Sequence, residues 1–107
     1  KLEAVESANK YAIDVPLETA ELCFRVIELA EILVEKGNPN SVSDISVASE
    51  VAIAGVKGAC MNVLINLSGL DDEAYCDDKR KSVKSLVSKA NSLVQAVYEK
   101  TIDKIES

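Results

Sequence analysis

The sequence predicts an all-α fold, an antiparallel helical bundle of three long helices plus part of a fourth. Three stretches of the chain carry apolar residues at spacings of three and four, which is the period of an amphipathic helix. Short segments rich in Gly, Asn, Pro, Ser and Asp separate these stretches, and no stretch alternates apolar and polar residues as a strand does. We therefore expect residues 1–107 to form a single helical domain.

The composition fits packed helices and excludes several classes of function. Hydrophobic residues make up 48% of the chain and aromatic residues only 4%, so the core is expected to be aliphatic. Without any His, the chain has no His-containing triad and no His ligand for a metal. The net charge of −6 and the lack of a basic patch argue against nucleic acid as a partner.

The cysteines and the apolar runs indicate the compartment. The 3 cysteines lie far apart with no C-x-x-C pair, which argues against a disulfide framework or a zinc site and suits a reducing cytoplasm. No apolar run approaches the roughly 18 residues that a membrane span needs. We expect a cytoplasmic protein with no metal and no membrane partner.

The N-terminal third is expected to hold two helices. Residues 1–13 are typical of a short helix or of the end of a longer one. Pro16 predicts a break and a new start, because proline suits the first turn of a helix. From residue 17 to residue 36, apolar residues follow one side of a helix while glutamates and an arginine follow the other. Gly37 is expected to end this helix.

The next helix is expected to begin within the string "KGNPNSVSDISVA". Either Ser41 or Ser43 can cap it, because a serine oxygen accepts hydrogen bonds from free amides of the first turn. If Ser41 is the cap, Asp44 falls at the third helical position, where a carboxylate can complete a capping box. The helix should run to about Leu67, and it carries only two charged residues after Asp44. We therefore expect it to be buried on nearly all sides, at the centre of the fold.

The last helix is expected to begin at the acidic run 71–73, where negative charge favours a helix N-terminus. It should continue to the C-terminus. Its core-facing side is marked by apolar residues at near-heptad spacing, namely Val83, Leu86, Val87, Ala90, Leu93, Val94 and Val97.

One face of the central helix is small in its middle and polar at both ends. Six residues lie within about 60° of one another around the helix: Asp44, Ala48, Gly55, Ala59, Asn62 and Asn66. We expect Asp44, Asn62 and Asn66 to converge on a shared hollow that can hold a flat ligand. The alternative is that the small residues form a helix–helix contact and that the two amides bond a neighbouring backbone.

Two strings of this chain, "KGNPNSVSDISVA" and "GACMNVLINL", resemble the C-terminal part of the formiminotransferase-cyclodeaminase / methenyltetrahydrofolate cyclohydrolase family. The family's pattern Gly-Asn-x-x-x-x-Ser-Asp is matched by Gly37, Asn38, Ser43 and Asp44. Its second pattern, Gly-Ala-x-x-Asn-Val-x-Ile-Asn-Leu, is matched over residues 58–67. Family members are about twice as long, so the chain is expected to be the C-terminal half of a larger cyclodeaminase/cyclohydrolase-type domain.

The resemblance implies an all-helical homodimer that takes a tetrahydrofolate derivative as substrate, with no covalently bound cofactor and no metal. The activities it implies are hydrolysis of 5,10-methenyltetrahydrofolate to 10-formyltetrahydrofolate and cyclodeamination of 5-formiminotetrahydrofolate, and the sequence does not separate them. We expect Asp44 to be the catalytic acid–base residue and Asn38, Ser43, Asn62 and Asn66 to bind substrate. The absent N-terminal half is expected to supply further site residues. The second hypothesis is a non-catalytic helical-bundle module whose small-residue face is a packing or dimer seam.

Overall fold

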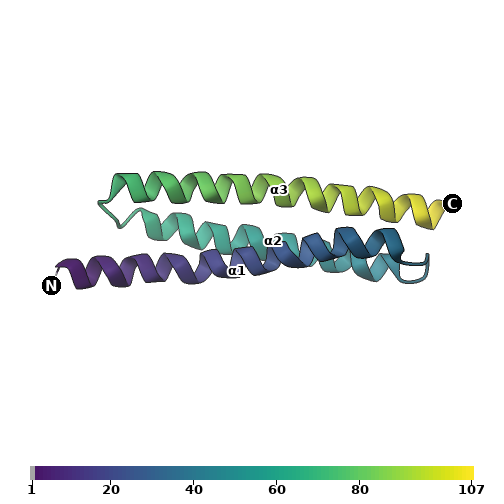
Figure 1. Cartoon of the computed structure of the whole chain (residues 1–107), viewed down its shortest axis with the longest axis horizontal. Coiled ribbons are helices and arrows are strands. Elements are labelled where there is room, and N and C mark those ends of the chain that lie inside the picture. The colour runs from purple at the N-terminus through teal and green to yellow at the C-terminus, as the bar shows by residue number, and fades with distance from the viewer. Residues whose placement is uncertain (1) are drawn as a thin grey trace.

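The computed structural model describes residues 2–107, which form three long helices. They are α1 (Leu2–Lys36), α2 (Val42–Leu67) and α3 (Glu73–Glu106). In Figure 1 the helices lie side by side, α1 and α3 run in one direction, and α2 runs in the other. The bundle measures 62 × 17 × 16 Å. The predicted all-α antiparallel bundle is confirmed, but it has three helices and no partial fourth within the described residues.

The predicted break at Pro16 is wrong, because α1 continues through this residue. A proline has no N–H to donate to the carbonyl group four residues earlier, which here belongs to Ala12. The Nδ2 group of Asn66 on α2 donates to the carbonyl oxygen of Ala12 at 3.2 Å. A side chain of the neighbouring helix therefore replaces the missing bond, and the residues predicted to form a separate helix become the start of α1.

The core is aliphatic, as the composition predicts. The contact between α1 and α2 is the most extensive of the three helix–helix contacts. A large cluster of buried residues joins all three helices, and Phe24 packs against it. A smaller cluster lies toward the 37–41 loop and consists of Ala30, Val34, Val42 and Val97.

The expectation that α2 is buried on nearly all sides is wrong. The other two helices cover only one side of it. Four large apolar side chains on its uncovered side are between 61% and 69% exposed: Val47, Val51, Met61 and Ile65.

The apolar character of α2 also bears on the membrane prediction. By length and composition alone α2 could cross a membrane, since an 18-residue window of it has a mean hydropathy of 1.4. The prediction that no apolar run is long enough to span a membrane is therefore not supported by the mean hydropathy of α2. The central helix of a bundle passes the same test, so the observation is weak evidence for a membrane protein.

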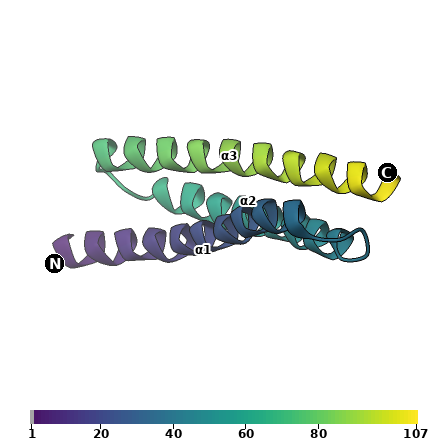
Figure 2. The same cartoon turned by 45° about the vertical axis from the view of Figure 1, so that its right-hand side comes forward.

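The two connecting loops lie at opposite ends of the bundle, as the turned view of Figure 2 also shows. At the 37–41 loop, α1 ends one residue before Gly37, whose N–H donates to the carbonyl of Leu33 at 2.8 Å. The predicted stop at Gly37 is confirmed. At the 68–72 loop, Asp72 caps α3, and its Oδ1 atom accepts from the backbone N–H of Tyr75 at 3.1 Å. The predicted acidic start of the last helix is confirmed.

The predicted capping box on α2 is wrong, although Ser41 does occupy the cap position. Its side chain accepts no hydrogen bond from the first turn of the helix. Instead the Ser41 hydroxyl donates to the carbonyl of Asn38 at 3.2 Å. The Asp44 side chain makes no hydrogen bond within residues 2–107 and is exposed. The serine therefore tightens the loop, and the aspartate is left available.

Candidate functional site

Two hollows open along the seam between α1 and α2, one near each end of α2. The first, which we call the amide hollow, has a volume of about 400 Å³. It is lined by Ala12, Val15, Pro16 and Thr19 of α1 and by Ala59, Asn62 and Asn66 of α2. Its two asparagines are the only residues of its α2 wall that carry hydrogen-bonding side chains.

The second hollow, which we call the aspartate hollow, has a volume of about 350 Å³. Apart from Asp44 its lining is entirely apolar, so any polar interaction with a ligand there must come from this carboxylate or from the backbone. The lining residues are Val26, Leu29, Ala30 and Leu33 of α1 and Asp44, Ile45 and Ala48 of α2.

Between the hollows, α1 and α2 approach closely. A Cβ atom placed on Gly55 would lie 2.6 Å from the Sγ atom of Cys23, a distance at which one of the two must move. Glycine is therefore the residue that permits this contact. The small middle of the face is thus used for helix packing, as the structural alternative proposed.

The expected convergence of Asp44 with the asparagines does not occur within one chain. Asp44 and Asn62 are 18 residues apart on one helix, which places them about 27 Å apart along its axis. They line different hollows, separated by the Gly55 contact. Asp44 and Asn62 do lie on the same side of α2, as predicted. Because that side extends along the whole helix, residues near its two ends remain far apart.

The two asparagines differ in what they do. Asn66 donates one of its amide hydrogens to the backbone of α1, which is the structural role named as the alternative. Asn62 is exposed and makes no side-chain hydrogen bond to any of residues 2–107. The Asn62 amide is therefore the freer of the two to meet a ligand in the amide hollow.

Asn38 and Ser43 line neither hollow. The Oδ1 atom of Asn38 accepts from the backbone N–H of Asn40 at 2.9 Å, which stabilises the loop before α2. Ser43 is exposed beside Asp44 at the start of the helix. Their predicted role in substrate binding stays a prediction, and the observed role of Asn38 is to shape the turn.

The sequence analysis did not identify the α1 walls of the two hollows. Val15, Val26, Leu29 and Leu33 are apolar and about half exposed, on a side of α1 that faces neither α3 nor the core. The signal was present in their spacing of eleven, three and four residues, which keeps them on one side of a helix.

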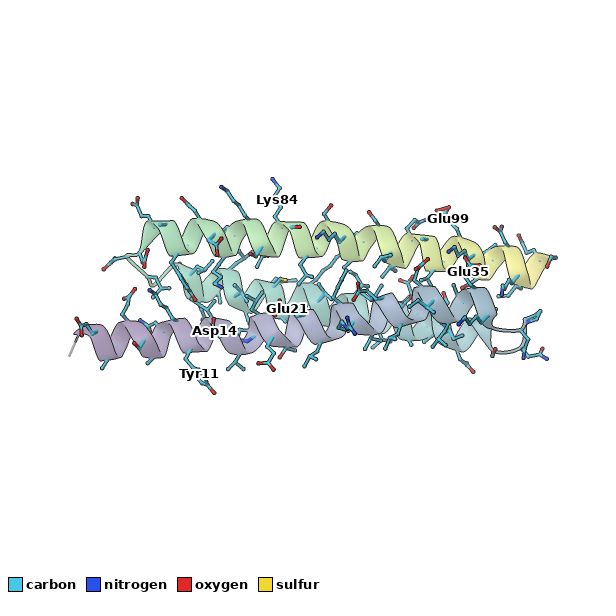
Figure 3. The ribbon with its side chains drawn as sticks, in the orientation of Figure 1. Tyr11, Asp14, Glu21, Glu35, Lys84 and Glu99 are labelled. Carbon is cyan, nitrogen blue, oxygen red and sulfur yellow. The ribbon has the colours of Figure 1, made fainter. Side chains whose placement is uncertain are left out.

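Charged residues form ion pairs elsewhere in the molecule, on the seam between α1 and α3. Lys100 bridges two carboxylates of α1, with its Nζ atom 2.9 Å from Glu31 and in contact with Glu35. Figure 3 shows Glu35 beside α3. Hydrogen bonding to Lys100 lowers the pKa of Glu35, and the two carboxylates raise the pKa of Lys100. These pairs link α3 to α1, and no lysine or arginine lines either hollow.

A second charged cluster surrounds the start of α3. The Nζ atom of Lys10 lies 3.1 Å from Asp72 and 4.7 Å from the centre of the Tyr75 ring. The Tyr75 hydroxyl is buried without a hydrogen-bond partner among the described residues, and this burial raises its pKa. Within residues 2–107 no three Asp, Glu or Cys side chains gather closely enough to hold a metal ion.

Comparison with known proteins shows which protein family this chain resembles. Residues 1–85 match the family described as Formiminotransferase-cyclodeaminase. The chain is 42% identical over 101 residues to a methenyltetrahydrofolate cyclohydrolase of Methylorubrum extorquens, covering 94% of this chain and 49% of that protein. It is 33% identical over 89 residues to a formimidoyltransferase-cyclodeaminase of Rattus norvegicus, covering 83% of this chain and 16% of that protein.

A further relative shows how far the similarity extends. Over 103 residues the chain is 30% identical to a formimidoyltransferase-cyclodeaminase of Gallus gallus, covering 94% of this chain and 19% of that protein. The chain spans about half the length of the cyclohydrolase that it matches and a smaller part of the longer proteins. One motif spans the 37–41 loop and the start of α2, the other lies at the end of α2, and the family match extends over residues 1–85, so this chain belongs to the formiminotransferase-cyclodeaminase family.

Proposed function

We propose that this chain is part of an enzyme that hydrolyses 5,10-methenyltetrahydrofolate to 10-formyltetrahydrofolate. The observation that carries the proposal is the 42% identity, over 101 residues, to a protein named as a methenyltetrahydrofolate cyclohydrolase. Identity to a formimidoyltransferase-cyclodeaminase is 33%, which makes cyclodeamination of 5-formiminotetrahydrofolate, with release of ammonia, the second candidate.

The hydrolysis requires a base and a partly dry site. Water adds to the methenyl carbon between the two nitrogens, a base accepts a proton from that water, and one carbon–nitrogen bond then breaks. The nitrogen that leaves takes up a proton, and the hydroxyl proton of the adduct passes to solvent as the formyl carbonyl forms, so the reaction releases one proton overall. One group that accepts and returns a proton can therefore serve both the attack of water and the departure of the nitrogen. Asp44 is the proposed group, because it is the one carboxylate in an otherwise apolar hollow.

The second candidate reaction uses the same kind of proton transfer. In cyclodeamination one folate nitrogen attacks the formimino carbon, and the amine leaves as ammonia after it gains a proton. Asp44 would deliver that proton, and amides such as Asn62 would orient the pterin edge through paired donor and acceptor groups. Neither hollow distinguishes the two reactions by its lining.

The non-catalytic alternative also has support in the structure. Gly55 and Asn66, two members of the predicted site face, are engaged in contacts with α1. A packing role alone would account for them, and the helix dipole would account for an exposed acid in the first turn of α2. What favours catalysis is that the Asp44 carboxylate lines a hollow whose other lining residues are all apolar.

The proposal also covers the substrate, cofactors, compartment and oligomeric state of the enzyme. The substrate is a tetrahydrofolate derivative, with no metal and no covalently bound cofactor, in a cytoplasmic homodimer. Because the chain spans 49% of the cyclohydrolase relative, the remaining half of the domain is proposed to contribute further site residues.

The test is loss of the absorbance of 5,10-methenyltetrahydrofolate on addition of the intact protein, followed by identification of the product. A rate above the spontaneous hydrolysis is expected. Release of ammonia from 5-formiminotetrahydrofolate without any hydrolysis of the methenyl compound would favour the second candidate. No turnover of either compound would leave only the packing role.

A further inference from the structure

The last two turns of α3 lie against the loop that connects α1 to α2. In Figure 1 the C-terminal end of α3 and the 37–41 loop are at the same end of the bundle. The Nζ atom of Lys104 donates there to two backbone carbonyl oxygens, that of Glu35 at 2.8 Å and that of Gly37 at 2.8 Å. Lys104 thus bonds the loop itself, whereas Lys100, one turn earlier on α3, pairs with carboxylates of α1.

These two hydrogen bonds satisfy the end of a helix. The last four carbonyl groups of an α-helix have no partner within the helix, and they carry partial negative charge. The carbonyl of Glu35 is one of these, and that of Gly37 directly follows the helix. An ammonium group suits both, since it carries three donors and a positive charge. Lys104 therefore caps α1 from another helix and holds the first residue of the loop at the same time.

The rest of the loop is held by a chain of backbone hydrogen bonds. The carbonyl of Asn38 accepts from the N–H of Ser41 at 3.0 Å and from the N–H of Val42 at 3.2 Å. The carbonyl of Ser41 accepts from the N–H of Ile45 at 3.3 Å. These bonds leave little freedom between the start of the loop and the first turn of α2, which contains Asp44.

Gly37 also packs directly against the wall of the aspartate hollow. A Cβ atom placed on it would lie 3.1 Å from the Cγ1 atom of Val42. It would lie 3.3 Å from both the Cδ1 atom of Ile45 and the carbonyl oxygen of Leu33. Leu33 and Ile45 line the aspartate hollow together with Asp44. Because Gly37 fits so closely, a displacement of its backbone would displace these walls as well.

α3 supports the same region by packing. Val42 and Val97 are fully buried in the smaller core cluster, and Ile45 packs against this cluster. Val97 lies seven residues before Lys104, which places both on the same side of α3. Between them, the buried hydroxyl of Thr101 donates to the carbonyl of Val97 at 2.7 Å. One side of α3 therefore makes both apolar and polar contacts with the segment that begins α2.

We propose that Lys104 is a positioning residue for Asp44. Its ammonium group holds Gly37 against the start of α2, and the loop and the first turn then hold the Asp44 carboxylate at the aspartate hollow. A proton-transfer group must lie within hydrogen-bonding reach of the reacting atoms, so a small displacement lowers turnover. The inference rests on the proposed function, because this positioning matters for turnover only if Asp44 transfers a proton. Lys104 lies outside residues 1–85, so the family match gives it no role.

The first experiment compares two matched variants of the intact protein. Lys104→Met removes the ammonium group and keeps an apolar stem of similar length. Lys100→Met is the control, because it removes two ion pairs that link the same helices and leaves the bonds to the loop. The kcat for 5,10-methenyltetrahydrofolate should fall about tenfold in Lys104→Met, with little change in KM, and stay near wild type in Lys100→Met. Equal losses in both variants, or no loss in Lys104→Met, would overturn the proposal.

The second experiment asks whether Lys104 acts through Asp44. In an Asp44→Asn background there is no carboxylate to position, so Lys104→Met should lower kcat by less than about twofold further. The same loss of kcat in both backgrounds would show that Lys104 affects turnover by another route, and the positioning role would then be wrong.

The third experiment measures the hold on the loop without relying on activity. Hydrogen exchange followed by mass spectrometry reports how often the backbone amides open. In Lys104→Met the amides of residues 37–45 should exchange at least about tenfold faster than in Lys100→Met, while those of residues 73–80 should be alike in the two variants. Equal exchange of residues 37–45 in the two variants would show that Lys104 does not hold the loop.

These measurements separate a failure of this inference from a failure of the proposed function. If the intact wild type turns over neither folate compound, the proposed function is wrong, and faster exchange in Lys104→Met would still support the hold on the loop. If the wild type is active and Asp44→Asn is impaired, a normal kcat in Lys104→Met overturns the positioning role alone.

Discussion

A Cβ atom on Gly55 would lie 2.6 Å from the Sγ atom of Cys23, so these two residues determine how closely α1 and α2 approach. Gly55→Ala is expected to force the Cys23 sulfur away from its present position, and the cost of this overpacking, about 1–3 kcal/mol, is offset by the ~1 kcal/mol of helix propensity that alanine gains over glycine, so the fold should be destabilised by about 0–2 kcal/mol. Urea denaturation followed by circular dichroism measures the change.

The matched control for this change is the double variant Gly55→Ala with Cys23→Ala. It removes the sulfur atom, and the remaining Cβ of residue 23 would be 3.5 Å from the new methyl group, an ordinary contact. Most of the lost stability should return. If the single and double variants are equally unstable, the sulfur contact is not what requires glycine at position 55.

The bond from Asn66 to Ala12 gives a second prediction. Asn66→Ala removes the donor to the carbonyl of Ala12, and Pro16 has none to offer. Because this bond is exposed, water can replace the donor, so the change should cost only about 0.5–1.5 kcal/mol of unfolding free energy. In a Pro16→Ala background the helix can supply its own N–H, so the same change should cost less. A double-mutant cycle in urea measures this coupling. Equal costs in both backgrounds would show that Asn66 stabilises α1 by some other route.

Asp44 provides the catalytic prediction. Asp44→Asn keeps the shape of the side chain but removes the base, and turnover of 5,10-methenyltetrahydrofolate should fall at least about tenfold, with less effect on KM. Glu50→Gln is the control, since Glu50 is an exposed acid of α2 that lines neither hollow. Near-normal kcat in Asp44→Asn with an unchanged circular dichroism spectrum would rule out this assignment.

The ion pairs predict how stability depends on pH. The backbone N–H of Tyr75 and the Lys10 ammonium lower the pKa of Asp72 below its usual 3.8. Lys100 lowers the pKa of Glu35 below its usual 4.5 in the same way. A carboxylate with a lowered pKa in the folded state stabilises the fold above its usual pKa, and this contribution is lost as the pH falls through the lowered value.

The urea midpoint should therefore be steady from pH 7 to about 5 with respect to these two groups and fall at more acidic pH. Asp72→Asn should flatten part of that fall. Asp71→Asn serves as the neighbouring control, because the Asp71 side chain has no ion pair within residues 2–107. An identical acid profile for wild type and Asp72→Asn would contradict the assigned cause.

Much of the fold was predictable from the sequence, because helix period and helix caps are local properties. The 37–41 turn, the end at Leu67 and the acidic start of α3 all follow from neighbours along the chain. The continuation of α1 through Pro16 does not, since it depends on an amide 50 residues away in sequence. Local rules correctly describe what proline does to its own helix and cannot include a donor from another helix.

The sequence predicted which side of α2 carries the candidate site residues, but not that these residues lie in two separate hollows. Helical periodicity correctly put Asp44 and Asn62 on the side of α2 that borders α1. Periodicity does not take account of the distance between two residues along the helix. It also does not show that Asn66, rather than Asn62, donates to a backbone carbonyl of α1. The spacing of Leu22, Val26 and Leu29 predicts an apolar stripe on α1. Only the exposed fractions of these side chains in the structure show that nothing in residues 2–107 covers the stripe.

The dimensions of the bundle, more than three times as long as it is wide, affect how its mass must be measured. A rod of this shape diffuses slowly and elutes from a sizing column ahead of a sphere of equal mass, so early elution alone does not count subunits. Side-by-side pairing of two copies would thicken the rod without lengthening it. Frictional drag per unit mass would then fall, and a rise in sedimentation velocity together with a rounder shape would distinguish lateral pairing from end-to-end association.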